Sequence, residues 1–106
     1  MAVDSPEWQS PILTDLWGAV IGVLPDDWES AVLELAATDR GFGLGLSHAI
    51  SGPPGSRGLA FPDDAVFEAA RRLELGFAER GLAFRRAQVR VEYNGEAWDC
   101  NVQYEY

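Results

Sequence analysis

Hydrophobic residues recur at helical spacing near the start of the chain. The apolar positions are Leu13, Leu16, Trp17, Val20 and Leu24. This spacing predicts an amphipathic helix over residues 11–23, with Pro11 as its first residue and Ser10 as its N-cap. Pro25 ends the pattern. Residues 1–10 carry two Ser-Pro pairs, and we expect them to form a loose N-terminal lead-in.

A second helical pattern covers residues 63–80. Its predicted buried stripe consists of Val66, Ala70, Leu73 and Phe77. Asp63 and Asp64 open the segment and Gly81 follows it, as expected for residues that cap a helix and complement its dipole. Gly76 within the segment costs about 1 kcal/mol relative to alanine. We therefore expect this helix to depend on tertiary packing.

The sequence pattern predicts two strands between these helices. Residues 28–36 place Ala31, Leu33 and Leu35 on one face, with Trp28 and Val32 on the other. In the next strand, apolar residues and His48 alternate with small residues: Phe42, Leu44, Leu46, His48 and Ile50 against Gly43, Gly45, Ser47 and Ala49. Residues 51–58 are rich in Gly, Pro and Ser, a composition typical of a loop.

The last third of the chain predicts a β-hairpin. Asn94-Gly95 is the strongest short signal for a two-residue type I′ turn. Such a turn sets Tyr93 opposite Glu96. On one face it pairs Val91 with Trp98, Val89 with Cys100 and Ala87 with Val102. On the other face it pairs Arg90 with Asp99 as an ion pair and Gln88 with Asn101.

The predicted order is helix, strand, strand, helix, strand, strand. This order favours an α+β fold, a two-layer sandwich in which two helices cover one face of a mostly antiparallel sheet of about four strands. We expect one domain over residues 11–106, with the other sheet face in water. The length of 106 residues is enough for one hydrophobic core.

The net charge limits the classes of partner that the protein can bind. The chain contains seventeen acidic residues, eight arginines and no lysine, which gives a net charge of −9. Such a protein repels nucleic acid and anionic membranes, because binding to phosphate depends on Lys and Arg. The charge would steer it toward a basic protein, although acidic residues also serve solubility alone. No apolar stretch approaches the ~20 residues of a membrane span, and no signal peptide is recognisable.

Few residues could carry chemistry. Gly41–Gly45 alternates inside a predicted strand, where it is unsuited to cradle a phosphate and would instead leave a bare surface. His48 and Cys100 belong to no recognisable catalytic motif, and the lone cysteine suits a reducing cytoplasm. The pairs Asp26-Asp27 and Asp63-Asp64 precede regular elements, where turn and capping roles are common. We expect no enzyme activity, no cofactor and no metal.

The aromatic content is high for this length. Trp17 and Trp98 fall on core-facing positions of the predicted elements. Trp8 and Trp28 do not, and exposed aromatic residues are typical anchors of protein interfaces. For Trp28 the alternative is that it packs beneath a loop.

Over residues 12–106 the chain resembles the YezG-like antitoxin (immunity protein) family of bacterial polymorphic-toxin systems. The resemblance rests on the amphipathic first helix ending in Leu24-Pro25-x-x-Trp28, the two following strands, Phe61-Pro62-Asp63-Asp64 before the second helix, and the hairpin Tyr93-Asn94-Gly95-Glu96-Ala97-Trp98 running into Val102-Gln103-Tyr104-Glu105-Tyr106. This chain is more compact and carries a Pro-Gly loop at residues 52–55. The resemblance implies a non-enzymatic cytoplasmic protein that binds and blocks a cognate toxin, often of the nuclease type.

The leading hypothesis is therefore an immunity-type binding module that occludes a basic toxin. We expect the partner to bind the uncovered sheet face and nearby acidic loops, through Asp26, Asp27, Trp28, Glu34, Arg90, Glu92, Asp99 and Glu105. Two alternatives stay open. One is a self-associating module, a homodimer formed through the Gly43/Gly45/Ser47 face or the C-terminal strand. The other is a small ligand carrier or enzyme with a pocket near His48.

Overall fold

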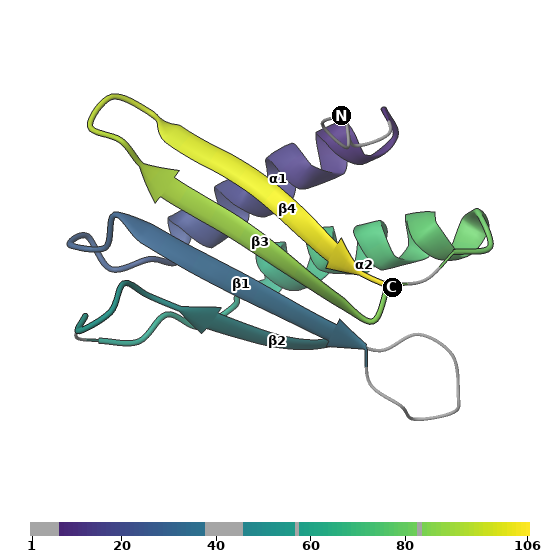
Figure 1. The fold of residues 1–106 in the computed structure, drawn as a ribbon, viewed down its shortest axis with the longest axis horizontal. Coiled ribbons are helices and arrows are strands. Elements are labelled where there is room, and N and C mark those ends of the chain that lie inside the picture. The colour runs from purple at the N-terminus through teal and green to yellow at the C-terminus, as the bar shows by residue number, and fades with distance from the viewer. Residues whose placement is uncertain (1–6, 38–45, 57, 83) are drawn as a thin grey trace.

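The computed structural model describes residues 7–37, 46–56, 58–82 and 84–106. They form two helices and four strands, in the predicted order (Figure 1). The elements are α1 (Gln9–Gly22), β1 (Ser30–Ala37), β2 (Leu46–Ser51), α2 (Asp64–Glu79), β3 (Arg86–Tyr93) and β4 (Trp98–Glu105). All neighbouring strands are antiparallel, and the strand order is β2-β1-β3-β4.

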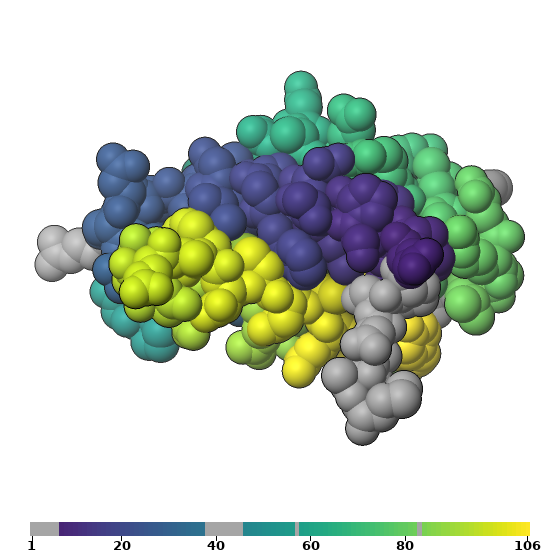
Figure 2. All heavy atoms as spheres, turned by 90° about the horizontal axis from the view of Figure 1, so that it is seen from above, coloured from purple at the N-terminus to yellow at the C-terminus, as the bar shows by residue number. Residues whose placement is uncertain are grey.

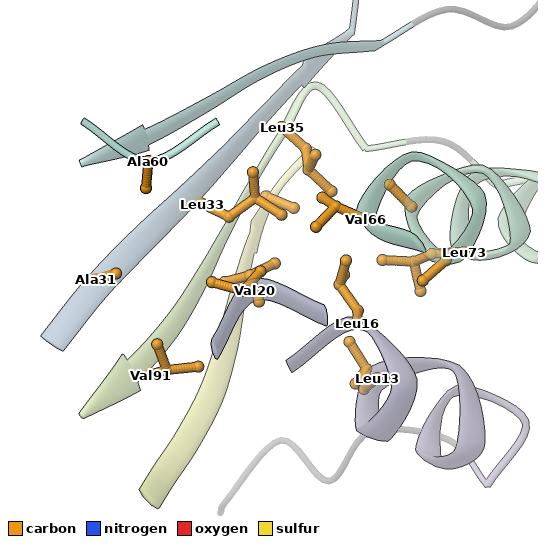
Figure 3. Packing of buried hydrophobic residues seen from close by; sticks show 14 of the residues in the cluster. Leu13, Leu16, Val20, Ala31, Leu33, Leu35, Ala60, Val66, Leu73 and Val91 are labelled. Atoms are coloured by element: carbon orange, nitrogen blue, oxygen red, sulfur yellow. The ribbon is translucent and has the colours of Figure 1, made fainter. Parts of the chain in front are cut away.

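The fold has the two predicted layers, with both helices behind one face of the sheet (Figure 1). The core lies between these layers. In Figure 3, Leu16 and Val20 of α1 and Val66 of α2 point toward Leu33 and Leu35 of β1. All five side chains are essentially inaccessible to solvent. Burial of such aliphatic side chains, at about 25 cal/mol per Å² of apolar area, is the main stabilising contribution to a domain of this size.

Helix α2 confirms the capping prediction. The Val66 N–H donates to Oδ1 of Asp63 at 3.1 Å, so Asp63 is the N-cap and satisfies one of the free amides of the first turn. Gly81 follows the helix with φ of +69°, a conformation that favours glycine. The predicted stripe of Val66, Ala70, Leu73 and Phe77 is buried.

Helix α1 begins earlier than predicted. It starts at Gln9, so the predicted start at Pro11 and the N-cap at Ser10 are wrong, while residues 1–6 of the expected lead-in lie outside the described residues. Pro11 is the third helical residue, a position whose N–H would have no partner within the helix, so the proline is tolerated there. Gln9 is buried, and its Oε1 accepts a hydrogen bond from the Tyr104 hydroxyl at 2.7 Å. This contact draws the first turn of α1 onto β4, and Figure 2 shows α1 beside β4.

Trp8 is part of the packing, which corrects the expectation of an exposed anchor. Its ring meets the edge of the Phe77 ring at a centroid distance of 5.1 Å. The Arg80 guanidinium lies 4.1 Å from the Trp8 ring centroid, in a cation–π contact. A Cβ atom built on Gly76 would overlap the Trp8 ring. Gly76 is therefore present because α2 needs a flat site on which the indole can lie.

The C-terminal hairpin forms with a register that differs from the prediction. Tyr93 pairs with Trp98, Val91 with Cys100 and Val89 with Val102, so the loop has four residues and not two. Gly95 has positive φ but Asn94 does not, which excludes a type I′ turn. Oδ1 of Asn94 instead accepts hydrogen bonds from the N–H groups of Glu96 and Ala97. Because the slip is two residues, every side chain keeps its predicted face.

The first two strands agree with the predicted alternation. Strand β1 begins at Ser30, two residues later than predicted, and buries Ala31, Leu33 and Leu35. Strand β2 covers the second half of the predicted 42–50 strand. The glycine-rich part of that prediction, Gly41–Gly45, lies outside the described residues.

We predict opposite effects for the same substitution at two helical glycines. Gly76→Ala should lower the free energy of unfolding by about 1–3 kcal/mol, because the new methyl group displaces Trp8. Gly18→Ala in α1 should raise it by up to about 1 kcal/mol, because nothing lies within 4 Å of the added Cβ and alanine favours the helix. Urea denaturation of both variants measures the two values.

A Trp8→Ala background provides the control. Without the indole, Gly76→Ala should become stabilising, as it is for a helix position with free space. If Gly76→Ala destabilises equally in both backgrounds, the explanation through Trp8 is wrong.

Candidate functional site

The sheet face that the helices leave uncovered carries all the acidic and arginine side chains of the four strands. We call it the open face. Its side chains come from alternate positions of each strand: Ser30, Val32, Glu34 and Ala36; Ser47, Ala49 and Ser51; Arg86, Gln88, Arg90 and Glu92; Asp99, Asn101, Gln103 and Glu105. Charged and buried strand residues lie on separate faces because successive side chains of a strand point to opposite sides of the sheet.

Basic and acidic side chains are unevenly distributed over the open face. Arg86 lies opposite Glu105 in the sheet, and its Nε is 3.6 Å from Oε2 of Glu34. Glu92 lies directly opposite Asp99, a pairing of like charges. Like charges in this relation repel each other in a sheet. One end of the open face is therefore mixed in charge, and the other end, at the β3–β4 turn, is acidic.

The predicted ion pair between Arg90 and Asp99 is wrong. The four-residue turn places Arg90 opposite Asn101. Nη2 of Arg90 donates to Oε1 of Gln88 at 3.4 Å, a long contact along the same strand. Oδ2 of Asp99 accepts from the Asn94 side chain at 3.2 Å.

Two adjoining cavities lie at the acidic end. The first, of about 380 Å³, is lined by Asp27, Glu29, Ser30, Pro53, Glu92 and Tyr93. The second, of about 330 Å³, shares Ser30, Pro53 and Glu92 with the first and extends along the open face to Arg90, Asp99 and Asn101. We call the two together the acidic groove. Four carboxylates line it, Asp27, Glu29, Glu92 and Asp99, and all four residues are exposed.

The structure brings most of the predicted site residues together. Glu34, Arg90, Glu92, Asp99 and Glu105 share the open face, and Asp27 lines the acidic groove. Asp26 is exposed in the turn before β1, where the Trp28 N–H donates to the Pro25 carbonyl at 3.0 Å.

Trp28 does not belong to this surface. Its side chain is only 5% exposed, which corrects its expected role as a partner-binding anchor. A Cβ atom built on Gly52 would lie 2.8 Å from the indole, so the ring packs against the loop that follows β2. The alternative of a tryptophan beneath a loop is the correct one.

Sequence reasoning missed several residues of the groove. Glu29 directly precedes β1 and Tyr93 is the last residue of β3. They are far apart in the chain but adjacent in the sheet, where the Tyr93 N–H donates to the Glu29 carbonyl at 2.7 Å. Pro53 reaches the groove from the loop after β2. Nothing in the local sequence indicated that Glu29 would line the same cavity as Glu92.

His48 and Cys100 occupy packed positions. The His48 ring meets the edge of the Phe67 ring at a centroid distance of 4.8 Å, and partial burial lowers the pKa of the imidazole. His48 lines neither of the two groove cavities. Burial, and then the charge of Asp99, raise the pKa of the Cys100 thiol, which disfavours the reactive thiolate.

Within the described residues, no group of three or more His, Cys, Asp or Glu side chains could hold a metal ion. In the same part of the chain, neither helix has the length and apolar character needed to cross a membrane. No protein-family model matches the chain, and a search of curated proteins finds no matching relative.

We predict that His48 makes stability depend on pH. Its pKa is lower in the folded protein than the value of about 6.5 in the unfolded chain, so the unfolded state binds the proton more readily. The folded state is therefore favoured above the unfolded pKa, and this advantage is lost as the pH falls from about 6.5 through the lower pKa of the folded protein. Denaturation at about pH 7.5 and about pH 5.5 should show a larger loss in the wild type than in His48→Phe. Equal losses would contradict this assignment.

Proposed function

We propose that this protein is a non-enzymatic binding module that docks a basic protein on its open face, centred on the acidic groove. The observation that carries the proposal is the placement of the strand charges. A net charge of −9 is combined with an uncovered sheet face that bears Glu92 and Asp99 at one end, where Asp27 and Glu29 from the segment before β1 complete four exposed carboxylates around a groove. The negative electrostatic potential of such a surface accelerates its encounter with a positively charged protein and orients that protein for binding.

The rest of the open face suits close contact with a protein surface. The side chains of β1 and β2 on this face include small ones, among them Ser30, Ala36 and Ala49, which leave the strand backbone accessible to a partner. Side-chain amides of Gln88, Asn101 and Gln103 offer both hydrogen-bond donors and acceptors. A partner can therefore approach the backbone of β1 and β2 while its basic side chains reach the groove.

The groove favours arginine or lysine side chains of the partner. Carboxylates such as Glu92 and Asp99 accept charge-assisted hydrogen bonds from a guanidinium or ammonium group. Tyr93 also lines the first cavity, although strand alternation directs its ring to the other face, where it contacts the Trp98 ring. Binding of a cation between Glu92 and Asp99 would also relieve the repulsion between these opposed residues.

The resemblance to YezG-like immunity proteins supports a specific biological role. An immunity protein neutralises its cognate toxin by covering the surface that the toxin needs. Nuclease-type toxins bind nucleic acid through basic surfaces, so an acidic inhibitor can compete for the same surface. Our proposal is that this chain acts in this way in the cytoplasm.

Two charge-reversal pairs test the proposal. Glu92→Lys with Asp99→Lys changes the acidic groove. Glu68→Lys with Glu79→Lys changes the net charge by the same amount but on exposed positions of α2, in the other layer. We expect the tagged wild-type protein to capture a basic protein from its native host, and the α2 variant to retain it. The groove variant should lose at least about tenfold in affinity, equal to 1.4 kcal/mol, for two charge-assisted contacts.

Binding is measured at low and high salt, with the captured protein identified by mass spectrometry. Affinity of the wild type should fall as salt rises. Equal weakening of the two double variants would show that net charge alone is responsible and would remove the groove from the proposal. An acidic or salt-insensitive partner would contradict the electrostatic mechanism.

A further inference from the structure

The β2 edge of the sheet is unpaired and is bordered by exposed apolar side chains. Strand β2 is the first in the order β2-β1-β3-β4, and no described strand pairs with its outer side. Leu59 and Phe61, which lie between β2 and α2, are 73% and 69% exposed. Between them Ala60 is buried, beside the end of β2 in Figure 3. Phe67 is 43% exposed and contacts His48 of β2.

The hydrogen bonds of β1 determine which backbone groups of β2 face outward. The Ala37 N–H donates to the Arg85 carbonyl, and the Glu29 carbonyl accepts from Tyr93, so the odd-numbered residues of β1 bond toward β3. The even-numbered residues then bond toward β2, where they pair with Ser47, Ala49 and Ser51. The N–H and C=O groups of Leu46, His48 and Ile50 are consequently directed to the free edge.

These three residues are spaced to match a second copy of themselves. In an antiparallel pairing about a two-fold axis at His48, Leu46 of one chain lies opposite Ile50 of the other, and His48 lies opposite His48. All three outward positions are then hydrogen-bonded. On the open face, the same register places Ser47 opposite Ala49. Each cross-strand pair joins side chains without a carboxylate.

Charge distinguishes this edge from the other one. A two-fold interface brings a surface against itself, so a chain of net charge −9 self-associates most readily where that surface has few acidic groups. Residues 46–51 and 58–62 contain none, and the acidic residues that follow them are Asp63 and Asp64 at the start of α2 and Glu68 beside Phe67. On β4, antiparallel self-pairing about Val102 would set Asp99 against Glu105 of the second copy.

We propose that a second copy of this chain docks on the β2 edge, forming a two-fold dimer with a continuous eight-stranded antiparallel sheet. The pairing covers the apolar surface of Leu59, Phe61 and Phe67. The paired residues are Leu46–Ile50, whereas the acidic groove meets β2 only at Ser51 and the loop that follows it.

Sedimentation equilibrium of the full chain over a concentration series tests the dimer. The wild type should reach twice the mass of one 11.6 kDa chain. Phe61→Glu and Leu59→Glu each place a carboxylate at the contact and should raise the dimer dissociation constant at least about tenfold. Both side chains are largely exposed in the single chain, so far-UV circular dichroism should be unchanged.

Leu82→Glu is the matched control, because Leu82 is 53% exposed but follows α2 at its C-terminal end, away from His48 and Phe67. This variant should dimerise like the wild type. A wild type that keeps the mass of one chain throughout, dimers unaffected by all three substitutions, or equal weakening by Leu82→Glu would each overturn the proposal. Because no basic partner enters the measurement, its result is independent of the proposed function.

Discussion

Burial of only one face of a four-stranded sheet is the constraint on which the other features of this protein depend. Two helices supply enough apolar surface to cover one side, so alternate residues such as Leu33 and Val89 are excluded from water. The intervening residues must then face solvent, and the strand charges, including Glu34, Arg90 and Glu92, gather there. The candidate site is a direct consequence of this separation, because strand alternation alone brings its charged side chains to one face.

Tryptophans close the two ends of the core by lying on glycines. Trp8 packs on Gly76 of α2, and Trp28 packs against Gly52 after β2. Aromatic side chains with this much area contribute strongly to stability once buried. Three of the exposed large apolar side chains, Leu59, Phe61 and Phe67, lie near β2. The molecule thus has a charged surface suited to a basic partner and a separate uncharged edge suited to a second copy.

Much of the fold could be predicted from local patterns. The stripe from Val66 to Phe77, the cap at Asp63 and the alternation of β1 are each determined by residues close together in the chain. The hairpin shows where this reasoning fails. The side chain of Asn94 accepts two backbone hydrogen bonds and stabilises a four-residue loop, which shifts the pairing of β3 with β4. The predicted faces are correct because the register shifts by an even number of residues, but the predicted ion pair between Arg90 and Asp99 does not form.

By itself, the sequence determined the type and order of the elements and, for the described strand residues, the face on which each one lies, although it placed Trp28 in a strand on the uncovered face. These properties follow from the periods of the helix and the strand, which act over a few residues. Tertiary structure alone decided the strand order, the packing of Trp8 on Gly76, the burial of Trp28, and the meeting of Glu29, Glu92 and Asp99 at one groove. Contacts between distant segments depend on how whole elements pack and on the exact turn between them, and neither is encoded in a local pattern.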